Sequence, residues 1–175
     1  MIIQAQEKDI PQLVNLINSA YRGNESRKGW TTEADLIEGD LRTDEEALSA
    51  LLQRNGSVIL KYVSGNQLTG CVHLEKQNER LYLGMLSVSP AMQGKNIGKK
   101  LLVAAEEHAL ENQMSSIVMT VINVRHELIQ WYEKHGYKKT GETKPFPTDD
   151  KFGSPKQPLE FVVLEKAIAR DRNFT

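Results

Sequence analysis

Short runs rich in β-forming residues alternate with helix-like segments along most of the chain. Apolar residues at helical spacing predict one helix from Ile10, with Asp9 as its N-cap, and a second helix over Asp44–Gln53. Between them, residues 21–33 (YRGNESRKGWTTE) are polar and aperiodic, which is typical of a loop. β-Branched and aromatic residues predict strands at residues 2–6, 57–63, 68–76, 81–88, 116–121, 137–143 and 159–165.

The second half of the chain adds two helices and a long connection. Helices are predicted over Ile97–Glu111 and Arg125–His135, and Gly136 is a suitable residue to end the latter. Four of the six prolines fall within residues 143–158, which predicts a loop that is too long for a simple hairpin turn and is a candidate lid. The order of elements predicts an α/β fold, a mixed sheet with helices on its faces.

Composition and charge narrow the class of protein. The chain has 175 residues, 39% of them hydrophobic, and suits one domain over residues 1–166 followed by a polar tail at 167–175. A net charge of −1 argues against a nucleic-acid partner. Cys71 is the single cysteine, so no intrachain disulfide can form. Without a signal-like N-terminus or a long apolar run, a cytoplasmic protein with no membrane partner is expected.

A loop rich in glycine and lysine lies between a predicted strand and a predicted helix. Residues 87–100 read SVSPAMQGKNIGKK. The nucleotide-binding pattern GxxxxGK[ST] would need glycine at Gln93 and serine or threonine at Lys100, and the pattern GxGxxG is absent. Free N–H groups at a helix start still favour an anion, and Lys95 and Lys99 add positive charge.

This loop resembles the central motif of the GCN5-related N-acetyltransferases (GNATs), a strand followed by [QR]xxGx[GA] and a helix. The matching segment is Gln93–Gly98, with Asn96 at the family's usual central glycine; asparagine tolerates a left-handed backbone. Leu86–Pro90 (LSVSP) matches the family's LxVxP strand end. Trp131–Tyr137 (WYEKHGY) is similar to the family's YEKxGF signature. The resemblance is clear over roughly residues 57–143 and weak outside them.

The resemblance implies a mixed, mostly antiparallel central sheet of about seven strands with helices on both faces. It also implies direct transfer of an acetyl group from acetyl-CoA to a primary amine of a small molecule or peptide. In the family the loop holds the pyrophosphate of acetyl-CoA, and the preceding strand binds its pantetheine arm. The residues carried over as cofactor-binding are Leu86, Ser87, Val88, Gln93, Gly94, Lys95, Asn96, Ile97, Gly98, Lys99, Lys100, Asn123 and Tyr132.

Three side chains are candidates for acid–base catalysis. Tyr132 matches the family's frequent general-acid tyrosine, and the alternative for it is a tyrosine packed in the core. The general base would be Glu75 or Glu33, each of which also suits a solvated carboxylate. The oxyanion donor would be a backbone N–H near Leu86–Val88. No metal site is expected, since the HExxH pattern fails at Gln130.

Candidate residues for the amine acceptor come mainly from the loop after the first helix. They are Tyr21, Arg22, Trp30, Glu33 and Glu75. Two opposite substrates stay open: Asp149 and Asp150 would attract a cationic amine, whereas Arg22 and Arg27 would bind a carboxylate. A catalytically idle acyl-CoA sensor or assembly module on the same fold is the alternative function. Dimerisation through an exposed strand also stays open.

Overall fold

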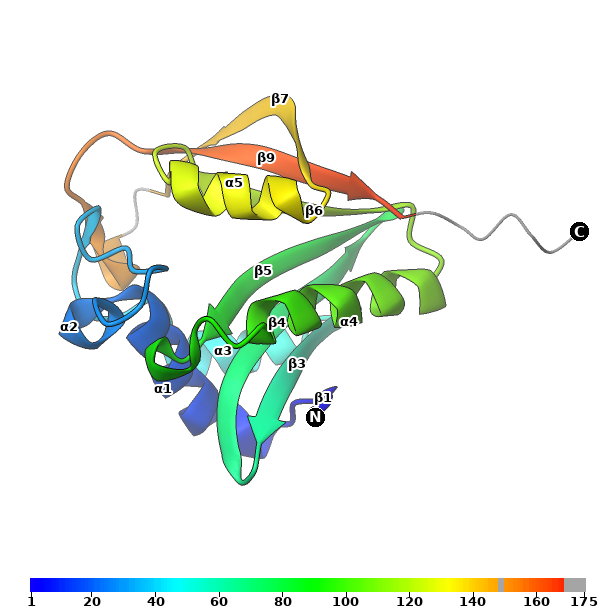
Figure 1. The fold of residues 1–175 in the computed structure, drawn as a ribbon, viewed down its shortest axis with the longest axis horizontal. Coiled ribbons are helices and arrows are strands. Elements are labelled where there is room, and N and C mark those ends of the chain that lie inside the picture. The colour runs from blue at the N-terminus through cyan, green and yellow to red at the C-terminus, as the bar shows by residue number, and fades with distance from the viewer. Residues whose placement is uncertain (148–149, 169–175) are drawn as a thin grey trace, which may run out of the picture.

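A seven-stranded sheet organises the computed structural model, which describes residues 1–147 and 150–168. The strand order is β1-β3-β4-β5-β6-β9-β7 (Figure 1). Neighbouring strands are antiparallel except β5 and β6, which are parallel, so the expected mixed and mostly antiparallel sheet is confirmed. The strands of this sheet are β1 (Ile2–Gln4), β3 (Ser57–Ser64), β4 (Gln67–Gln77), β5 (Arg80–Val88), β6 (Ser116–Ile122), β7 (Lys138–Pro145) and β9 (Glu160–Ala167).

Helices cover both faces of the sheet, as expected. In Figure 1, α4 (Ile97–Glu111) and α5 (His126–Lys134) lie in front of it, and α1 (Ile10–Tyr21) and α3 (Glu45–Leu52) lie behind it. Alternate residues of a strand point to opposite faces, so β4 supplies both cores. Its Val72 packs in the cluster below α4 and α5. Within the described residues, no helix has the length and apolar character needed to span a membrane.

The two parallel strands at the centre of the sheet separate. β5 pairs with β6 only from Arg80 to Tyr82, and beyond Tyr82 the two strands are no longer hydrogen-bonded to each other. Met85 adds a kink, since its φ of 49° is unusual for a residue other than glycine and the register with β4 shifts nearby. The rest of β5 therefore has backbone N–H and C=O groups that face away from β4 and have no strand partner on β6.

Three local predictions need correction. Asp9 precedes α1 but makes no side-chain cap, because its carboxylate accepts from the Gln6 N–H and pairs with Lys61 at 2.8 Å. The predicted loop at residues 21–33 contains the short helix α2 (Gly23–Ser26). The predicted loop at residues 143–158 is partly ordered by pairing with a distant segment.

That pairing joins two connections into a small second sheet. β2 (Ile37–Glu38) pairs antiparallel with β8 (Ser154–Pro155), just after the 3-10 turn Asp150–Phe152. Two-residue strands have no periodicity, so the sequence pattern could not reveal them. Asp149 lies outside the described residues, as does most of the expected tail, residues 169–175.

A buried histidine lies within the sheet. His73 on β4 is 4% exposed, and its Nε2 lies 2.8 Å from Ser57 Oγ and 3.9 Å from Glu75 Oε1. The Tyr82 ring packs against it edge-on at 6.1 Å. Burial lowers the pKa of His73 to about 4. The imidazole is therefore neutral in the folded protein near pH 7, which fits a sheet histidine.

This histidine predicts a loss of stability in mild acid. In the unfolded chain His73 binds a proton below pH ~6.5, whereas in the folded chain it does so only near pH 4. Its contribution to stability is full above pH ~6.5 and is lost as the pH falls towards 4. Between pH 7 and pH 5 the unfolding free energy should fall by about 2 kcal/mol more in the wild type than in His73→Gln. Urea unfolding at both pH values measures this difference, and equal losses in the two proteins would contradict it.

Candidate active site

A cleft of about 780 Å³ opens where β5, α4 and α5 meet. Its walls come from the end of β5, from the loop that leads into α4, and from one side of α5. Nine of the thirteen predicted cofactor residues line it: Leu86, Val88, Gln93, Gly94, Asn96, Ile97, Gly98, Lys99 and Tyr132. We call this hollow the cofactor cleft.

The loop at the mouth of the cofactor cleft has the backbone shape expected of an anion-binding turn. Gly94 has φ of 87°, and a side chain there would meet nothing within 4 Å. Asn96 has φ of 63° and ψ of 17°, which confirms that asparagine adopts the left-handed conformation at this position. Its side chain does not cap α4. The first N–H groups of that helix are therefore left for a ligand.

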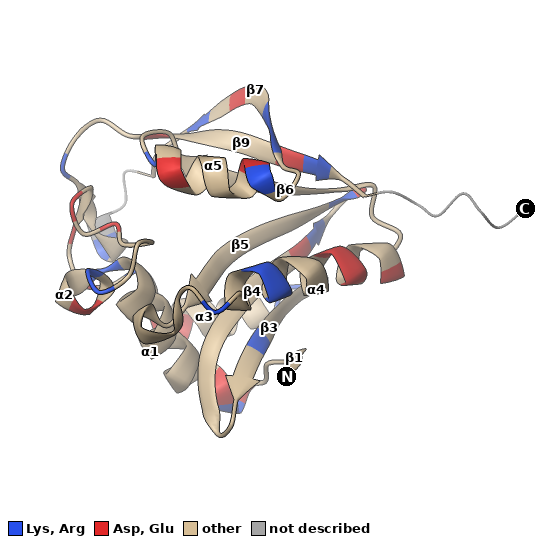
Figure 2. Cartoon of the chain, in the orientation of Figure 1, with Lys and Arg blue, Asp and Glu red and all other residues tan. Residues whose placement is uncertain are grey.

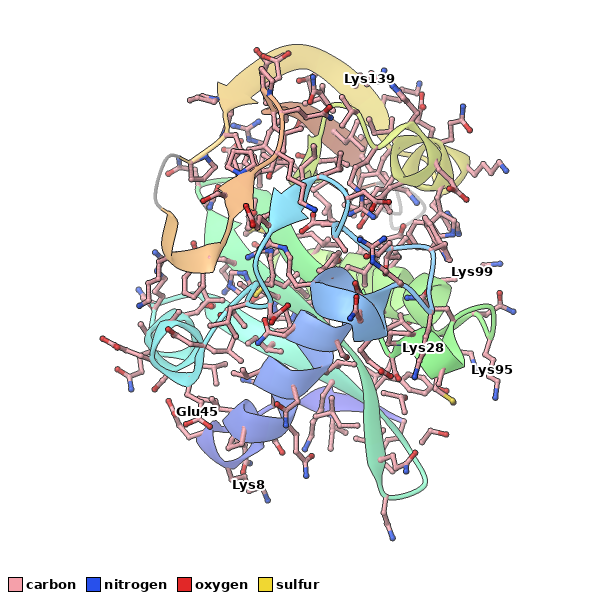
Figure 3. The ribbon with its side chains drawn as sticks, turned by 90° about the vertical axis from the view of Figure 1, so that its left-hand side faces the viewer. Lys8, Lys28, Glu45, Lys95, Lys99 and Lys139 are labelled. Atoms are coloured by element: carbon pink, nitrogen blue, oxygen red, sulfur yellow. The ribbon has the colours of Figure 1, made fainter. Side chains whose placement is uncertain are left out.

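The charges along α4 run against the helix dipole. Lys99 and Lys100 lie in its first turn, while Glu106, Glu107 and Glu111 lie in its C-terminal half (Figure 2). A helix is normally stabilised by the opposite arrangement. An anion bound at the N-terminus would reverse this penalty there. In Figure 3 the Lys99 side chain projects outward from this end of the helix.

Four predicted cofactor residues do not line the cleft. Ser87 is buried and donates to the Met85 carbonyl at 3.0 Å. Lys100 lies over the Tyr62 ring, and Lys95 extends along the surface to the Met92 sulfur (Figure 3). The Asn123 side chain accepts from the backbone N–H of Glu160 on β9 at 3.3 Å. The side chains of Ser87 and Asn123 are thus engaged within the protein, whereas the exposed side chains of Lys95 and Lys100 stay candidate cofactor contacts.

The Gln93 side chain links the loop between β5 and α4 to the segment that follows α2. Its Oε1 accepts from the Trp30 N–H at 2.8 Å, and its Nε2 donates to Thr31 Oγ1 at 2.9 Å and to the Val88 carbonyl at 3.2 Å. Gly29 permits this approach, because a Cβ there would lie 2.4 Å from Gln93 Oε1. The side chain therefore braces the loop, and the cofactor contact that the resemblance implies for Gln93 stays a prediction.

Two tryptophans close one side of the cleft. The rings of Trp30 and Trp131 are 6.1 Å apart, and Trp131 also contacts Tyr132 edge-on at 5.1 Å. Trp131 stands over Gly98, whose Cβ would come within 3.3 Å of the indole. Trp131 is not among the site residues predicted from the sequence. Its place next to Tyr132 in the WYEKHGY motif was the available signal.

Tyr132 lies at the inner end of the cofactor cleft. Its side chain packs between the Trp131 and Tyr137 rings, and the residue is only 5% exposed. No other described residue makes a hydrogen bond to its hydroxyl. Burial raises the pKa of Tyr132 well above that of a free tyrosine, so the phenol keeps its proton near pH 7. A buried, protonated and unpartnered phenol is suited to donate a proton to a ligand.

A second hollow of about 80 Å³ lies between the separated strands β5 and β6. It meets the cofactor cleft at four residues that line both: Tyr21, Leu86, Leu128 and Tyr132. Tyr21 donates to the Leu86 carbonyl and so fixes the strand at this junction. Burial raises the pKa of Tyr21 to about 12. We call this second hollow the acceptor pocket.

Glu33 lies at the acceptor pocket but is held by two arginines. Its Oε1 is 3.2 Å from Arg22 Nε and its Oε2 is 3.4 Å from Arg125 Nη1. Arg22 also donates to the carbonyls of Leu41 and Phe152, so its guanidinium joins three segments of chain. Both carboxylate oxygens of Glu33 and most donors of Arg22 are thus engaged within the protein.

Glu75 is not brought together with the other candidates. Its carboxylate lies 3.4 Å from Arg54 Nη1 near the far end of β4, and it lines neither the cofactor cleft nor the acceptor pocket.

Arg27 pairs with Asp35 at the surface at 2.8 Å. Cys71 is buried, and burial raises the pKa of its thiol to about 12. No group of three or more His, Cys, Asp or Glu side chains in residues 1–147 and 150–168 is placed to hold a metal ion.

Comparisons with known proteins agree with this fold. Residues 39–146, more than half of the chain, match the family model of the acetyltransferase (GNAT) domain. No curated protein sequence matches the chain. Among solved structures, the ribosomal-protein-S18-alanine N-acetyltransferase of Escherichia coli superposes with a TM-score of 0.72 at 12% identity, over 100% of this chain and 97% of that one.

Two further structures show the same fold at low identity. The ribosomal-protein-alanine N-acetyltransferase of Brucella melitensis gives a TM-score of 0.71 at 20% identity, covering 95% of this chain and 99% of that one. The PaiA N-acetyltransferase of Thermoplasma acidophilum, solved in complex with coenzyme A, gives 0.67 at 18% identity, covering 95% and 98%. The family match, together with the cleft at the start of α4, establishes that this chain belongs to the GNAT acetyltransferase family.

Proposed function

We propose that the chain is an acetyl-CoA-dependent N-acetyltransferase that acts on a primary amine of a small molecule or peptide. The observation that carries this proposal is the meeting of the cofactor cleft and the acceptor pocket at Tyr132. Direct transfer requires donor and acceptor to meet at one point in a fixed orientation. Family membership supports an acyl-CoA donor.

The residues of the cofactor cleft suit a ligand with a pyrophosphate and a long, uncharged arm. The uncapped start of α4 and Lys99 would hold the pyrophosphate. The edge of β5 at Leu86–Val88, which has no strand partner on β6, would bind the arm through its backbone N–H groups and supply an N–H to the oxyanion. Acetyl-CoA bound there would supply an activated thioester carbonyl.

Tyr132 would act as the general acid. It would donate its phenolic proton to the sulfur as the carbon–sulfur bond breaks, and it would regain a proton from solvent afterwards. Its raised pKa keeps this proton available at neutral pH. Tyr21 would hold the Leu86 carbonyl still during the transfer.

The two candidate bases differ in position. Glu75 lies outside both hollows, whereas Glu33 lines the acceptor pocket. Because Arg22 and Arg125 engage both oxygens of Glu33, we assign Glu33 to positioning these arginines. The amine proton would then leave to water at the open side of the pocket.

Calorimetric titration with acetyl-CoA tests the proposal, with ATP and NAD as controls. We expect saturable binding of acetyl-CoA alone, followed by release of CoA thiol when an accepted amine is added. A folded protein that does not bind acetyl-CoA would refute the proposal. Binding without thiol release from a broad set of amines would favour the idle sensor.

A further inference from the structure

An arginine without a partner among the described residues lines the acceptor pocket. Arg42 is partly buried, and its guanidinium makes no hydrogen bond or ion pair with any other described residue. The other arginines of this region are engaged: Arg22 and Arg125 with Glu33, and Arg27 with Asp35. An arginine that lines a pocket and has no partner among these residues is available to bind an anionic ligand.

The backbone that carries Arg42 is firmly held. Asn18 Oδ1 on α1 accepts from the Arg42 N–H at 2.6 Å and from the Thr43 N–H at 3.0 Å. Asn18 Nδ2 donates to the Thr43 carbonyl at 3.1 Å. These hydrogen bonds fix the start of the Arg42 side chain beside the pocket, and no other described residue holds its guanidinium.

The acceptor pocket therefore has an excess of positive charge. Its charged lining among the described residues consists of Glu33, Arg42 and Arg125. Glu33 is shared between Arg125 and Arg22, so the group as a whole carries two uncompensated positive charges. Burial lowers the pKa of Arg22, and the charge of Arg42 adds to this effect, as expected of like charges in close proximity.

We propose that the amine acceptor also carries a carboxylate, and that Arg42 binds this carboxylate in the acceptor pocket. The inference rests on the proposed function, because it names the substrate class of the same site. A guanidinium is suited to this task, since it offers two parallel N–H donors to the two carboxylate oxygens. The acceptor is then a small amino acid or a similar amino-carboxylate.

The same charge distribution favours the reactive form of such an acceptor. Nearby arginines disfavour an ammonium and favour the neutral amine. The pocket would thus hold the carboxylate and help release the amine proton, although the described residues that line it offer no free carboxylate as a base. A simple cationic amine without a carboxylate would meet only repulsion.

The test compares carboxylates with their uncharged counterparts. Wild-type protein saturated with CoA is titrated with the common free amino acids and with the carboxamide of each, and turnover with acetyl-CoA is followed on the same set by thiol release. We expect at least one free acid to bind and react at least about tenfold better than its carboxamide. This preference would oppose intrinsic reactivity, because the amine of the carboxamide is less basic and more of it is free at neutral pH.

Variants of Arg42 connect this preference to the residue. Arg42→Gln should weaken binding of the free acid about tenfold to a hundredfold and leave the carboxamide and CoA titrations unchanged. Arg42→Lys should retain part of the affinity. Arg27→Ala is the matched control, because it removes a surface arginine from the preceding segment without touching the pocket. Unchanged CoA binding shows that each variant is folded.

The outcomes separate this inference from the proposed function. Loss of acid preference in Arg42→Gln but not in Arg27→Ala supports it. Equal binding of acids and carboxamides, binding of no acid by CoA-loaded wild type, or an acid preference unaffected by Arg42→Gln overturns it while the cofactor assignment stands. A wild type that binds neither CoA nor acetyl-CoA refutes the proposed function itself.

Discussion

Gly98→Trp is expected to abolish acetyl-CoA binding, with an affinity loss of at least about a hundredfold. Gly98 lies in the first turn of α4, where a Cβ would come within 3.3 Å of Trp131 and 3.9 Å of the Val88 side chain. A larger side chain must therefore extend into the cofactor cleft or displace Trp131. Either result removes the space beside the helix N–H groups. Calorimetric titration of acetyl-CoA measures the effect.

Two other substitutions make this result interpretable. Val103→Trp places the same bulk on α4 at a side chain that is 46% exposed and outside the cofactor cleft, so acetyl-CoA affinity should be unchanged. Gly98→Ala adds only the Cβ and should weaken binding modestly, because Trp131 need shift by only a few tenths of an ångström. Tryptophan is also a better helix former than glycine, so lost binding in Gly98→Trp would not reflect a melted helix. Normal affinity in that variant would show that the ligand binds elsewhere.

The fold was predictable from the sequence to the extent that its elements are periodic. The helix Ile97–Glu111 was predicted with its observed bounds, because apolar residues repeat along its full length. Strand ends differ by one or two residues for most strands, since pairing partners decide where a ladder stops. The β2–β8 pairing was missed, because a two-residue strand depends on a contact between residues more than a hundred positions apart.

The candidate site was likewise predictable only in part from the sequence. The motif residues Gly94, Asn96 and Gly98 were found because their backbone demands are local and visible in the sequence. Side-chain partners were not visible: nothing near Arg22 in the chain indicates that it spans to Glu33 and Phe152. One of the two substrate alternatives predicted from the sequence placed a carboxylate at Arg22 and Arg27, whereas the pocket-lining arginine without a partner among the described residues is Arg42.

Hydrogen bonds join the loop before α4 to segments that are distant in the sequence. Gln93 joins the loop to Trp30 and Thr31, and Arg125 donates to the Thr31 carbonyl at 2.6 Å. The segment after α2 thereby contacts both the start of α4 and the turn before α5. The cofactor cleft, which Trp30 and Thr31 line, and the acceptor pocket, which Arg125 lines, therefore share this set of hydrogen bonds.

Tyr132→Phe is expected to lower kcat by about a hundredfold or more while acetyl-CoA affinity changes little. Phenylalanine keeps the ring contacts with Trp131 and Tyr137, so packing at the junction is preserved. Only the hydroxyl is lost, and no hydrogen bond within the described residues depends on it. An acid that acts as the carbon–sulfur bond breaks contributes to the transition state and not to ground-state binding. Steady-state kinetics with an accepted amine, together with acetyl-CoA titration, separate these effects.

Tyr137→Phe is the matched control for this substitution. The Tyr137 ring centroid lies 5.8 Å from that of Tyr132, and the residue is buried but lines neither hollow. Its hydroxyl has no hydrogen-bond partner among the residues that the structure describes. Removing that hydroxyl should leave kcat unchanged and should not destabilise the fold, because a buried unsatisfied group is removed. A large fall in kcat in both variants would indicate a general packing effect at this end of α5. A fall confined to Tyr132→Phe would assign the proton transfer to that phenol, and an unchanged kcat in Tyr132→Phe would exclude it as the acid.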